Sequence, residues 1–504
     1  MTRAVPEGYL GADARIRSGP APELVEAGYA LEVGDAPLLH RGLGLADLAH
    51  LIMLSKVGVV PVHDAGVLLA TVLEWLDVPA EAFPYDPRYG DAYNSREREL
   101  ERRHGATAGW LHTGRTRREA GRIAFRLALR DRLLGLHEAV DRLATALADQ
   151  ADAHAATPWA ETTYLQPAQP STFGHYLGGF GEEAGRHLGR LESAYAWVDQ
   201  SPAGAGGVGG TRVPLDRERL AGLLGFAAPG AHTRDAMWAT DGLADVVFAA
   251  TQAATTVDRL AEDLEIFAST GFGYVTLDAS LCRASVLMPQ KRNPYALAVI
   301  RAGAGTLVGR VTGLLVTQRT PSARTDNWLH AYGEVATSVE LARRIVALGA
   351  AVVATLTVDR EALGSAAGAH FTGAADLTEE LVLQTGLDYR SAYRVVGRAV
   401  AEAVAAGRPA IVAADLIRAA EQVLSRGIDI DDDLVTNALD PAQIIATRTA
   451  PGGAAPVRVR DHAAGLRRRL DAGTAWREEQ RRRTGTAEKA LIAAARELAE
   501  VRRG

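Results

Sequence analysis

The segment LADVVFAATQAATTVDRLAEDLEIFA, residues 243–268, decides the fold class of this chain. Its apolar side chains recur at alternating steps of four and three residues, a pattern typical of a helix that packs almost parallel to other helices. The residues of this seam are Leu243, Val247, Ala250, Ala254, Val257, Ala261, Leu264 and Ala268. The sequence therefore predicts a long helix buried lengthwise in a bundle, and a core role is enough to explain each of these residues.

The same rhythm returns in a second segment that begins after Pro294. Its apolar residues are Leu297, Ile300, Ala304, Leu307, Val311 and Leu314. Glycines in this segment each lower helix propensity by about 1 kcal/mol relative to alanine, so we expect them to permit close approach of neighbouring backbones. These glycines are Gly303, Gly305, Gly309 and Gly313. Because one subunit cannot easily cover helices that are apolar on more than one side, we expect a homo-oligomer.

The chain is expected to be all-α and to fold as three lobes. At 504 residues it exceeds the length that one hydrophobic core usually serves. Short helical stretches broken by proline and glycine predict an N-terminal helical lobe over residues 1–113. The seams predict a central long-helix bundle over residues 114–362, and shorter helices predict a C-terminal helical lobe over residues 363–504 that ends in a charged surface helix.

Composition and charge exclude several classes of protein. The formal charge of -6 and the isoelectric point near 6.1 give no electrostatic reason to expect nucleic acid or an anionic membrane as a partner. The single cysteine, Cys282, cannot form an internal disulfide, and no Cys/His cluster has metal-ligand spacing, so we expect no metal or other cofactor. The first residues lack the apolar core of a signal peptide, and the longest apolar stretch, around residues 345–358, is too short to span a bilayer. We therefore expect a cytoplasmic protein.

A glycine-dense stretch, PAGAGGVGGT at residues 202–211, superficially matches a phosphate-binding loop. It lacks the Lys-Ser/Thr pair of a P-loop, and no β-α-β pattern surrounds it. We therefore discount a nucleotide-binding role for this stretch.

Between the two seams lies ASVLMPQKRNP, residues 284–294. Because the residue before each proline is pushed out of helical geometry, a loop that holds serine, lysine and asparagine is a candidate for a mobile catalytic element. As a string, the segment strongly resembles the Gly-Ser-Ser-x-Met-Pro-x-Lys-x-Asn-Pro signature of the aspartase/fumarase superfamily. Val286 replaces the second serine of that signature, and Ala284 replaces the glycine before it.

Two further segments agree in order and spacing with the argininosuccinate lyase branch of that superfamily. HTGRTR at residues 112–117 resembles its His-Thr-Gly-Arg-Ser-Arg-Asn-Asp region, and TYLQPAQP at residues 163–170 resembles its Thr-His-Leu-Gln-x-Ala-Gln-Pro region. With shorter matches elsewhere, the resemblance covers roughly residues 40–460. It implies a fumarase/aspartase-like central bundle, and a homotetramer in which three subunits build each active site.

The resemblance also implies a reaction and a set of site residues. Removal of a proton beside a carboxylate gives an aci-carboxylate with two negative charges, which requires preorganised donors and cations. Ser285 stands at the family's catalytic serine, the base that takes the Cβ proton, and Lys291 with the amides of the loop could stabilise its oxyanion. The implied substrate-binding groups are Asn293 with Lys291 at the aci-carboxylate, Arg117 at a second carboxylate, and Thr116, Thr163 and Gln166 as neutral donors. Thr116 could equally be a helix N-cap, and no catalytic role is assigned to His112 or His175.

Three departures from the family pattern bear on the substrate. Tyr164 stands where the family usually has a histidine implicated in protonating the leaving group, so either the phenol assists departure or the amine leaves without a dedicated acid. A phenol that is simply packed in the site is the alternative. Arg118 replaces an asparagine, and its charge requires an extra substrate carboxylate or a local acid such as Glu119. Residues 321–328 lack the Tyr-Asn-Lys-Asp-Leu-Gln run that binds the arginine part in the true lyases.

The resulting hypothesis is a carbon–nitrogen lyase that acts on small dicarboxylate and amine substrates without metal or cofactor. The departures fit a subgroup similar to ethylenediamine-N,N'-disuccinate (EDDS) lyase, with Arg118 among the substrate-binding residues. The expected reaction is reversible β-elimination of an amine from an N-substituted aspartate to give fumarate. Two alternatives stay open: argininosuccinate lyase itself, and a structural protein that keeps the fold without activity.

Overall fold

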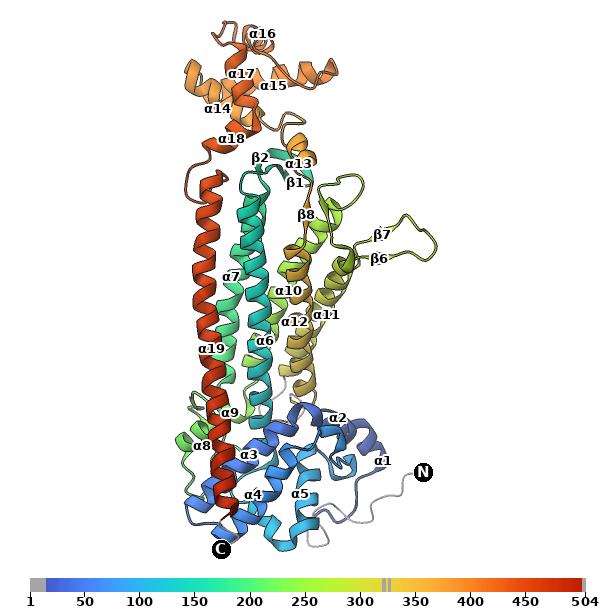
Figure 1. Cartoon of the computed structure of the whole chain (residues 1–504), viewed down its shortest axis with the longest axis vertical. Coiled ribbons are helices and arrows are strands. Elements are labelled where there is room, and N and C mark those ends of the chain that lie inside the picture. Colours follow the sequence, from blue (N-terminus) through green and yellow to red (C-terminus); the bar gives the residue numbers. More distant parts are fainter. Residues whose placement is uncertain (1–14, 320–322, 325–327, 501–504) are drawn as a thin grey trace.

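The chain forms an elongated, almost entirely helical molecule in which long helices run side by side between two smaller lobes (Figure 1). The computed structural model describes residues 15–319, 323–324 and 328–500. The helices of the bundle are α6 (Arg117–Ala153), α7 (Phe173–Val198), α10 (Asp241–Phe267), α11 (Tyr295–Gln318), α12 (Ala331–Ala354) and α19 (Pro456–Glu500). The expected all-α fold with a central long-helix bundle is confirmed.

The two sequence seams form neighbouring helices, α10 and α11, which pack against each other and against α12. The first seam is buried throughout, except that Ala268 at the end of α10 is only partly buried. A Cβ on Gly303 would meet Ile345 of α12 at 2.7 Å, so this glycine does permit close approach between helices. A Cβ on any of the other three glycines of α11 would meet nothing within 4 Å in the described chain. These three glycines are exposed, and none of them is needed for close packing between helices of the described chain.

Short strands and helices connect the long helices. Two antiparallel hairpins matter for the site: β1 (Pro158–Thr163) with β2 (Gln166–Thr172) beyond the end of α6, and β6 (Arg283–Ala284) with β7 (Arg292–Asn293), which projects from the side of the bundle (Figure 1). The remaining connecting elements are β3 (Gln200–Ser201), α8 (Arg217–Leu223), β4 (Ala228–Pro229), α9 (Thr233–Trp238), β5 (Val275–Thr276) and β8 (Thr357–Val358).

The C-terminal lobe contains less of the chain than the sequence predicts. Its helices are α13 (Arg360–Ala367), α14 (Ala374–Thr385), α15 (Tyr389–Ala405), α16 (Ala413–Leu424), α17 (Asp432–Leu439) and α18 (Pro441–Thr447). Helix α19, assigned above to this lobe, instead runs along the bundle and reaches the N-terminal lobe (Figure 1). The reason is the distribution of its apolar residues, because Leu466 and Leu470 join the core of the bundle and Leu491 joins that of the N-terminal lobe.

Four arginines spaced four residues apart project from α6 into the surrounding chain: Arg118, Arg122, Arg126 and Arg130. The last three donate to backbone carbonyls at the C-terminal ends of α9, α7 and α8. The contacts are Arg122 Nε to Met237 O at 3.1 Å, Arg126 Nη1 to Trp197 O at 2.6 Å and Arg130 Nη2 to Leu224 O at 3.2 Å. Because helix C-termini carry unpaired carbonyls and partial negative charge, guanidinium groups stabilise them on both counts.

Helix α11 differs from the sequence expectation in one respect. Among the described residues it is the one helix whose length and apolar composition would allow it to cross a membrane, with a mean hydropathy of 1.4. Only 17% of that apolar window is buried within the chain. The helix nevertheless packs against α10 and α12 as a member of the bundle. The described chain therefore leaves most of the apolar surface of this helix uncovered.

The N-terminal lobe consists of α1 (Pro22–Leu24), α2 (Ala30–Gly34), α3 (Ala36–Lys56), α4 (Val62–Leu76) and α5 (Ala92–His104). Within it, the carboxylate of Asp47 in α3 is fully buried between two arginines. Oδ1 accepts from Arg115 Nη2 at 2.6 Å, and Oδ2 accepts from Arg96 Nη2 at 3.1 Å. This network ties α3 and α5 to the residue that lies two positions before α6.

We expect Asp47→Asn to lower the free energy of unfolding by about 3–5 kcal/mol, because two buried guanidinium groups would lose their counter-charge. Urea unfolding followed by circular dichroism measures the change. As a control, Asp77→Asn alters an exposed carboxylate at the end of α4 and should change stability by less than about 0.5 kcal/mol. Equal stability of Asp47→Asn and the native protein would show that this network does not hold the lobe together.

Candidate active site

Helix α6 begins with the first group of candidate residues. Thr116 is the N-cap, and its Oγ1 accepts a hydrogen bond from Glu119 N at 3.2 Å. The same hydroxyl donates to Gly206 O at 3.2 Å. Thr116 therefore fulfils the capping role that the sequence left open, and it positions the two arginines that follow it.

Arg117 and Arg118 are each held by one carboxylate of the N-terminal lobe. Arg117 Nη1 lies 3.0 Å from Asp91 Oδ2, and Arg118 Nη1 lies 2.7 Å from Glu32 Oε2. The suggestion that Glu119 offsets the charge of Arg118 is wrong, because Glu32 supplies that carboxylate. No other hydrogen bond of either guanidinium group is seen within the described residues. Both groups therefore keep N–H donors for a ligand.

Glu119 instead organises the glycine-dense stretch. Its carboxylate accepts from Gly204 N at 2.7 Å and from Gly206 N at 2.6 Å, and both glycines have positive φ angles, of 78° and 62°. Only 1% of Glu119 is exposed. Burial raises its pKa to about 7, against the opposing effect of the two backbone N–H groups. The stretch thus binds a carboxylate of its own chain and fixes the start of α6.

The raised pKa of Glu119 predicts a pH-dependent stability. The folded carboxyl binds its proton more tightly than the unfolded one, so this contribution is complete at low pH and is lost as pH rises through the folded pKa of about 7. Relative to Glu119→Gln, the free energy of unfolding of the native protein should fall by about 3 kcal/mol between pH 4.5 and 7 and stay level above that. Chemical denaturation at a series of pH values measures the difference. A difference that is independent of pH would show that Glu119 has an ordinary pKa.

A small recess of about 20 Å³, enough for about one water molecule, lies beside these arginines. Its lining residues with charged or hydroxyl groups are Glu32, Asp35, Asp91, Tyr93, Arg117, Arg118 and Tyr332. Burial raises the pKa of Asp35 to about 6, and the charges of Glu32 and Glu334 act in the same direction. Sequence reasoning missed Glu32, Asp35 and Tyr332, since they belong to no motif and approach α6 only through folding.

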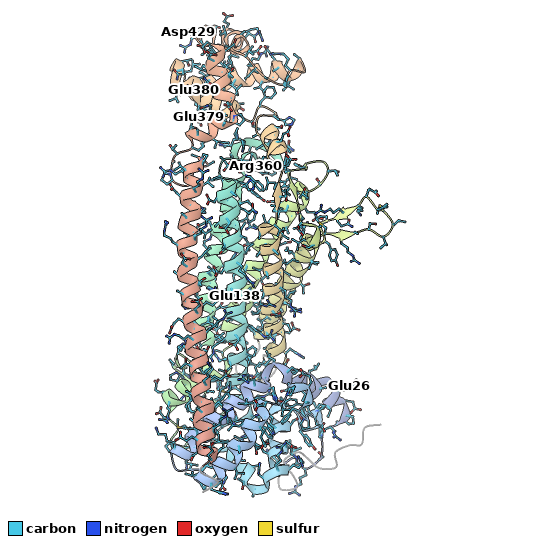
Figure 2. All side chains as sticks on the ribbon, viewed as in Figure 1. Glu26, Glu138, Arg360, Glu379, Glu380 and Asp429 are labelled. Carbon is cyan, nitrogen blue, oxygen red and sulfur yellow. The ribbon has the colours of Figure 1, made fainter. Side chains whose placement is uncertain are left out.

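The second group of candidate residues lies on the hairpin of β6 and β7. Ser285 Oγ accepts hydrogen bonds from Leu287 N at 3.3 Å and from Met288 N at 3.0 Å. These are the backbone donors that the sequence predicted around the serine, and they are suited to stabilise an oxyanion. The loop is highly exposed in the single chain, and its side chains stand clear of the bundle in Figure 2. Lys291 is exposed on the same loop, and Asn293 Nδ2 donates to Arg283 O at 3.0 Å.

The third group lies in the turn between β1 and β2, where Thr163 pairs with Gln166. Tyr164 and Leu165 form the turn with φ angles of 54° and 58°, a conformation that usually requires Asn or Gly. Tyr164 is 98% exposed, so its phenol packs against nothing in its own chain. Backbone strain of this kind is typically retained where it presents a side chain for function.

The three groups do not meet within one chain. Helix α6 separates the Thr116 group from the β1–β2 turn, and its 37 residues span about 55 Å. The β6–β7 hairpin projects sideways from a third position (Figure 1). A site that contains all three groups therefore needs more than one copy of the chain.

Other candidate groups have structural contacts. His112 Nδ1 lies 2.8 Å from Arg115 O, and His175 Nε2 lies 3.0 Å from Gly452 O. In the part of the chain that the structure covers, no group of three His, Cys, Asp or Glu residues could hold a metal ion. Most of the altered segment 321–328 lies outside the described residues.

Comparison with known proteins places this geometry in a family. Residues 72–309 match the family described as Lyase, and residues 371–446 match the family described as Argininosuccinate lyase C-terminal. An argininosuccinate lyase of Methanoculleus marisnigri is 34% identical over 462 residues, which cover 90% of this chain and 92% of that protein. An argininosuccinate lyase of Chelativorans sp. is 32% identical over 429 residues, which cover 84% of this chain and 89% of that protein.

Solved structures agree with these matches. An EDDS lyase variant with bound fumarate has a TM-score of 0.86 at 27% identity, and the alignment covers 96% of this chain and 97% of that one. The 3-carboxy-cis,cis-muconate lactonizing enzyme of Pseudomonas putida has a TM-score of 0.68 at 20% identity, covering 89% and 99% of the two chains, which shows the fold alone. The chain therefore belongs to the argininosuccinate lyase branch of the aspartase/fumarase superfamily and is a fumarate-forming carbon–nitrogen lyase.

Proposed function

We propose that the chain catalyses reversible β-elimination of an amine from an N-substituted aspartate of the aminopolycarboxylate type, such as EDDS, to give fumarate. The observation that carries this proposal is the pair of adjacent guanidinium groups at the start of α6. Arg117 and Arg118 line one recess, and each is held through a single nitrogen. Two such cations at a helix N-terminus suit a ligand with several carboxylates.

In the proposed reaction Ser285 takes the Cβ proton as an oxyanion. The N–H groups of Leu287 and Met288 already point at its Oγ and would stabilise that charge. Lys291 and Asn293 hold the aci-carboxylate that forms, and Arg117 with Thr116, Thr163 and Gln166 anchors the other carboxylate of the succinate unit. The C–N bond then breaks, the nitrogen keeps the electron pair, and fumarate is released.

Arg118 is assigned to a carboxylate on the amine portion of the substrate. Its ion pair with Glu32 offsets its charge in the free protein, so the charge alone does not demand a substrate carboxylate. A carboxylate could nevertheless bind the unused N–H groups of Arg118 bidentately, since guanidinium presents five donors. The overall similarity to EDDS lyase supports the same assignment.

Argininosuccinate lyase activity is the second candidate, because two relatives at 34% and 32% identity carry that name. The sequence also left open a catalytically silent structural role, which membership of this lyase family disfavours. Retention of Ser285, Lys291 and Asn293 together favours activity over that role. The cytoplasmic location expected from the sequence stays a prediction.

Incubation of the protein with EDDS, and separately with argininosuccinate, should release fumarate from EDDS alone, which ultraviolet absorbance measures directly. Arg118→Asn should slow elimination from EDDS more than elimination from N-(2-aminoethyl)aspartate, which lacks the second succinate unit. The expected difference is about 1–3 kcal/mol in transition-state binding, the size of a charge-assisted hydrogen bond. Fumarate from argininosuccinate alone would establish the second candidate, and no fumarate from either substrate would overturn both candidates.

We also propose that the chain acts as a homotetramer whose active sites are shared between subunits. The outward face of α11 is apolar, with Val308, Leu315 and Val316 each more than half exposed. The glycines on that helix that face outward are Gly305, Gly309 and Gly313. Such a stripe lets the helix of another copy approach closely, and the exposed apolar residues would then be buried.

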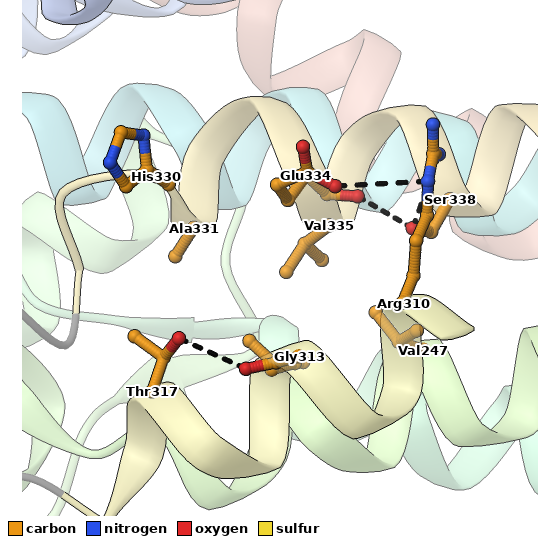
Figure 3. Close-up of a pocket in the computed structure, with 10 residues that line it drawn as sticks. Val247, Arg310, Gly313, Thr317, His330, Ala331, Glu334, Val335 and Ser338 are labelled. Carbon is orange, nitrogen blue, oxygen red and sulfur yellow. Dashed lines mark hydrogen bonds and ion pairs between the residues drawn. The ribbon is translucent and has the colours of Figure 1, made fainter. Parts of the chain in front are cut away.

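A pocket of about 220 Å³ between α11 and α12 adds to this surface (Figure 3). Gly313 and Thr317 line one wall, and Ala331 and Val335 line the other. Side chains from a second copy could fill it.

Ser285→Ala should lower turnover by about 100-fold or more and leave KM nearly unchanged, because it removes the base but no carboxylate contact. Steady-state kinetics of fumarate release measure both constants. As a matched control, Arg117→Ala should raise KM as well. Unchanged turnover in Ser285→Ala would remove this serine from the base role.

A separate experiment tests whether one active site contains residues from two chains. When Ser285→Ala and Arg117→Ala chains are denatured and refolded together, some sites receive both native residues from different subunits and should regain activity. A mixture as inactive as its components would mean that Ser285 and Arg117 act within the same chain.

A further inference from the structure

Tyr332 lines the recess, and neither the sequence motifs nor the comparison with the family gives its phenol a function. It lies on the first turn of α12, and its ring is fixed against Phe125 with a centroid separation of 4.7 Å. It lines the recess together with Arg117 and Arg118. Its hydroxyl also faces Gly121, where a Cβ would come within 3.2 Å of the oxygen. The packing therefore holds the hydroxyl at one place beside the proposed substrate site.

The hydroxyl of Tyr332 accepts a hydrogen bond from Arg122 Nη1. Arg122 is almost completely buried and has no carboxylate partner within the described residues. Its other donor contact is to Met237 O, and its guanidinium lies over the ring of Trp328 at 3.6 Å from the centroid. A buried cation without a counter-charge is unfavourable, so this guanidinium would be stabilised by any negative charge formed on the phenol oxygen.

The charged groups near Arg122 and Tyr332 do not supply Arg122 with a counter-charge of its own. Burial lowers the pKa of Arg122, and the positive charge of Arg118 lowers it further. Glu32 acts in the opposite direction but pairs directly with Arg118. The other charged residues of the recess are Asp91 and Arg117, which pair with each other, and Asp35, whose pKa burial raises to about 6. Among the described residues that line the recess, Tyr332 alone has a hydroxyl whose oxygen accepts a hydrogen bond from Arg122.

Resting on the proposed elimination reaction, we propose that Tyr332 is the proton donor to the departing amine, and that Arg122 is a positioning residue that stabilises the phenolate. In the direction of amine addition, the same phenolate accepts a proton from the nitrogen of the incoming neutral amine as the C–N bond forms. The recess has room for about one water molecule, so proton transfer can be direct or through one bridging water. This role would replace the histidine that Tyr164 displaces from the family pattern.

The proton balance of the step is complete. Ser285 takes the Cβ proton, the C–N bond breaks with its electron pair on nitrogen, and nitrogen takes the proton of Tyr332. The products are fumarate, a neutral amine, a protonated serine and a phenolate beside Arg122. Net transfer of one proton from the serine to the phenolate through solvent restores the resting enzyme, so no oxidant, metal or co-reactant is needed.

The test uses Tyr332→Phe, which removes one oxygen and keeps the ring. Elimination is measured with a series of N-substituted aspartates whose leaving amines run from basic alkylamines to weakly basic arylamines. Basic amines need a proton most, so Tyr332→Phe should lower kcat by about 100-fold for alkylamines and by less than about 10-fold for arylamines. A purely structural role would lower kcat equally across the series.

Tyr93→Phe is the matched control, since Tyr93 lines the same recess and bonds an arginine, Arg115 Nη2, at 3.3 Å. Burial raises the pKa of Tyr93, and we expect no dependence on the leaving amine for its variant. Arg122→Met should reproduce the pattern of Tyr332→Phe, whereas Arg122→Lys should restore part of kcat for alkylamines because a cation returns.

The outcomes separate this inference from the proposed function. An active native enzyme with a loss in Tyr332→Phe that is equal for all amines would overturn the role of Tyr332 alone. A native enzyme that releases no fumarate from any N-substituted aspartate would overturn both. Circular dichroism spectra that match the native protein confirm that each variant is folded before its rates are compared.

Discussion

The arginines that α6 projects every fourth residue are the interaction on which the rest of the structure depends. Arg122, Arg126 and Arg130 each reach the C-terminal end of a different helix, so a single helix fixes the ends of α9, α7 and α8. Aromatic rings cover these guanidinium groups, and Arg126 stacks on Trp197 at 4.2 Å from the ring centroid. The arrangement satisfies carbonyls that would otherwise be buried without donors. It also leaves Arg122 and Arg126 without carboxylates in the described chain.

Two buried carboxylates then set the start of α6, where the candidate substrate contacts begin. Asp47 holds Arg115 from the side of the N-terminal lobe, and Glu119 holds the backbone of the glycine-dense stretch. Thr116 lies between these two anchors. The side chains of Arg117 and Arg118 can therefore contribute to binding without large loss of conformational entropy, because their backbone is already fixed. The lobe has a positional role in the proposed chemistry as well as a structural one.

The distribution of candidate residues over three distant places explains several features that are unfavourable in a single chain. The serine loop, the strained turn at Tyr164 and the apolar face of α11 are all exposed. Each would be a liability for a monomer, since exposed apolar surface promotes association. In the proposed shared site, the same features would become contacts between subunits. Such contacts would also exclude water from a reaction that places two negative charges on one carboxylate. Oligomer formation and catalysis would thus have one physical cause.

The sequence by itself determined the helical bundle, because hydrophobic periodicity is a local property that survives in any helix long enough to display it. It also determined the family and the serine loop, because both are recognised from contiguous segments such as residues 284–294. The tertiary structure alone decided the partners of charged groups. Glu32 rather than Glu119 pairs with Arg118, and Tyr332 lies beside Arg122 from 210 residues away. The course of α19 was likewise a tertiary outcome. Such pairings depend on which surfaces meet after folding, and the periodicity of apolar residues along the sequence does not indicate them.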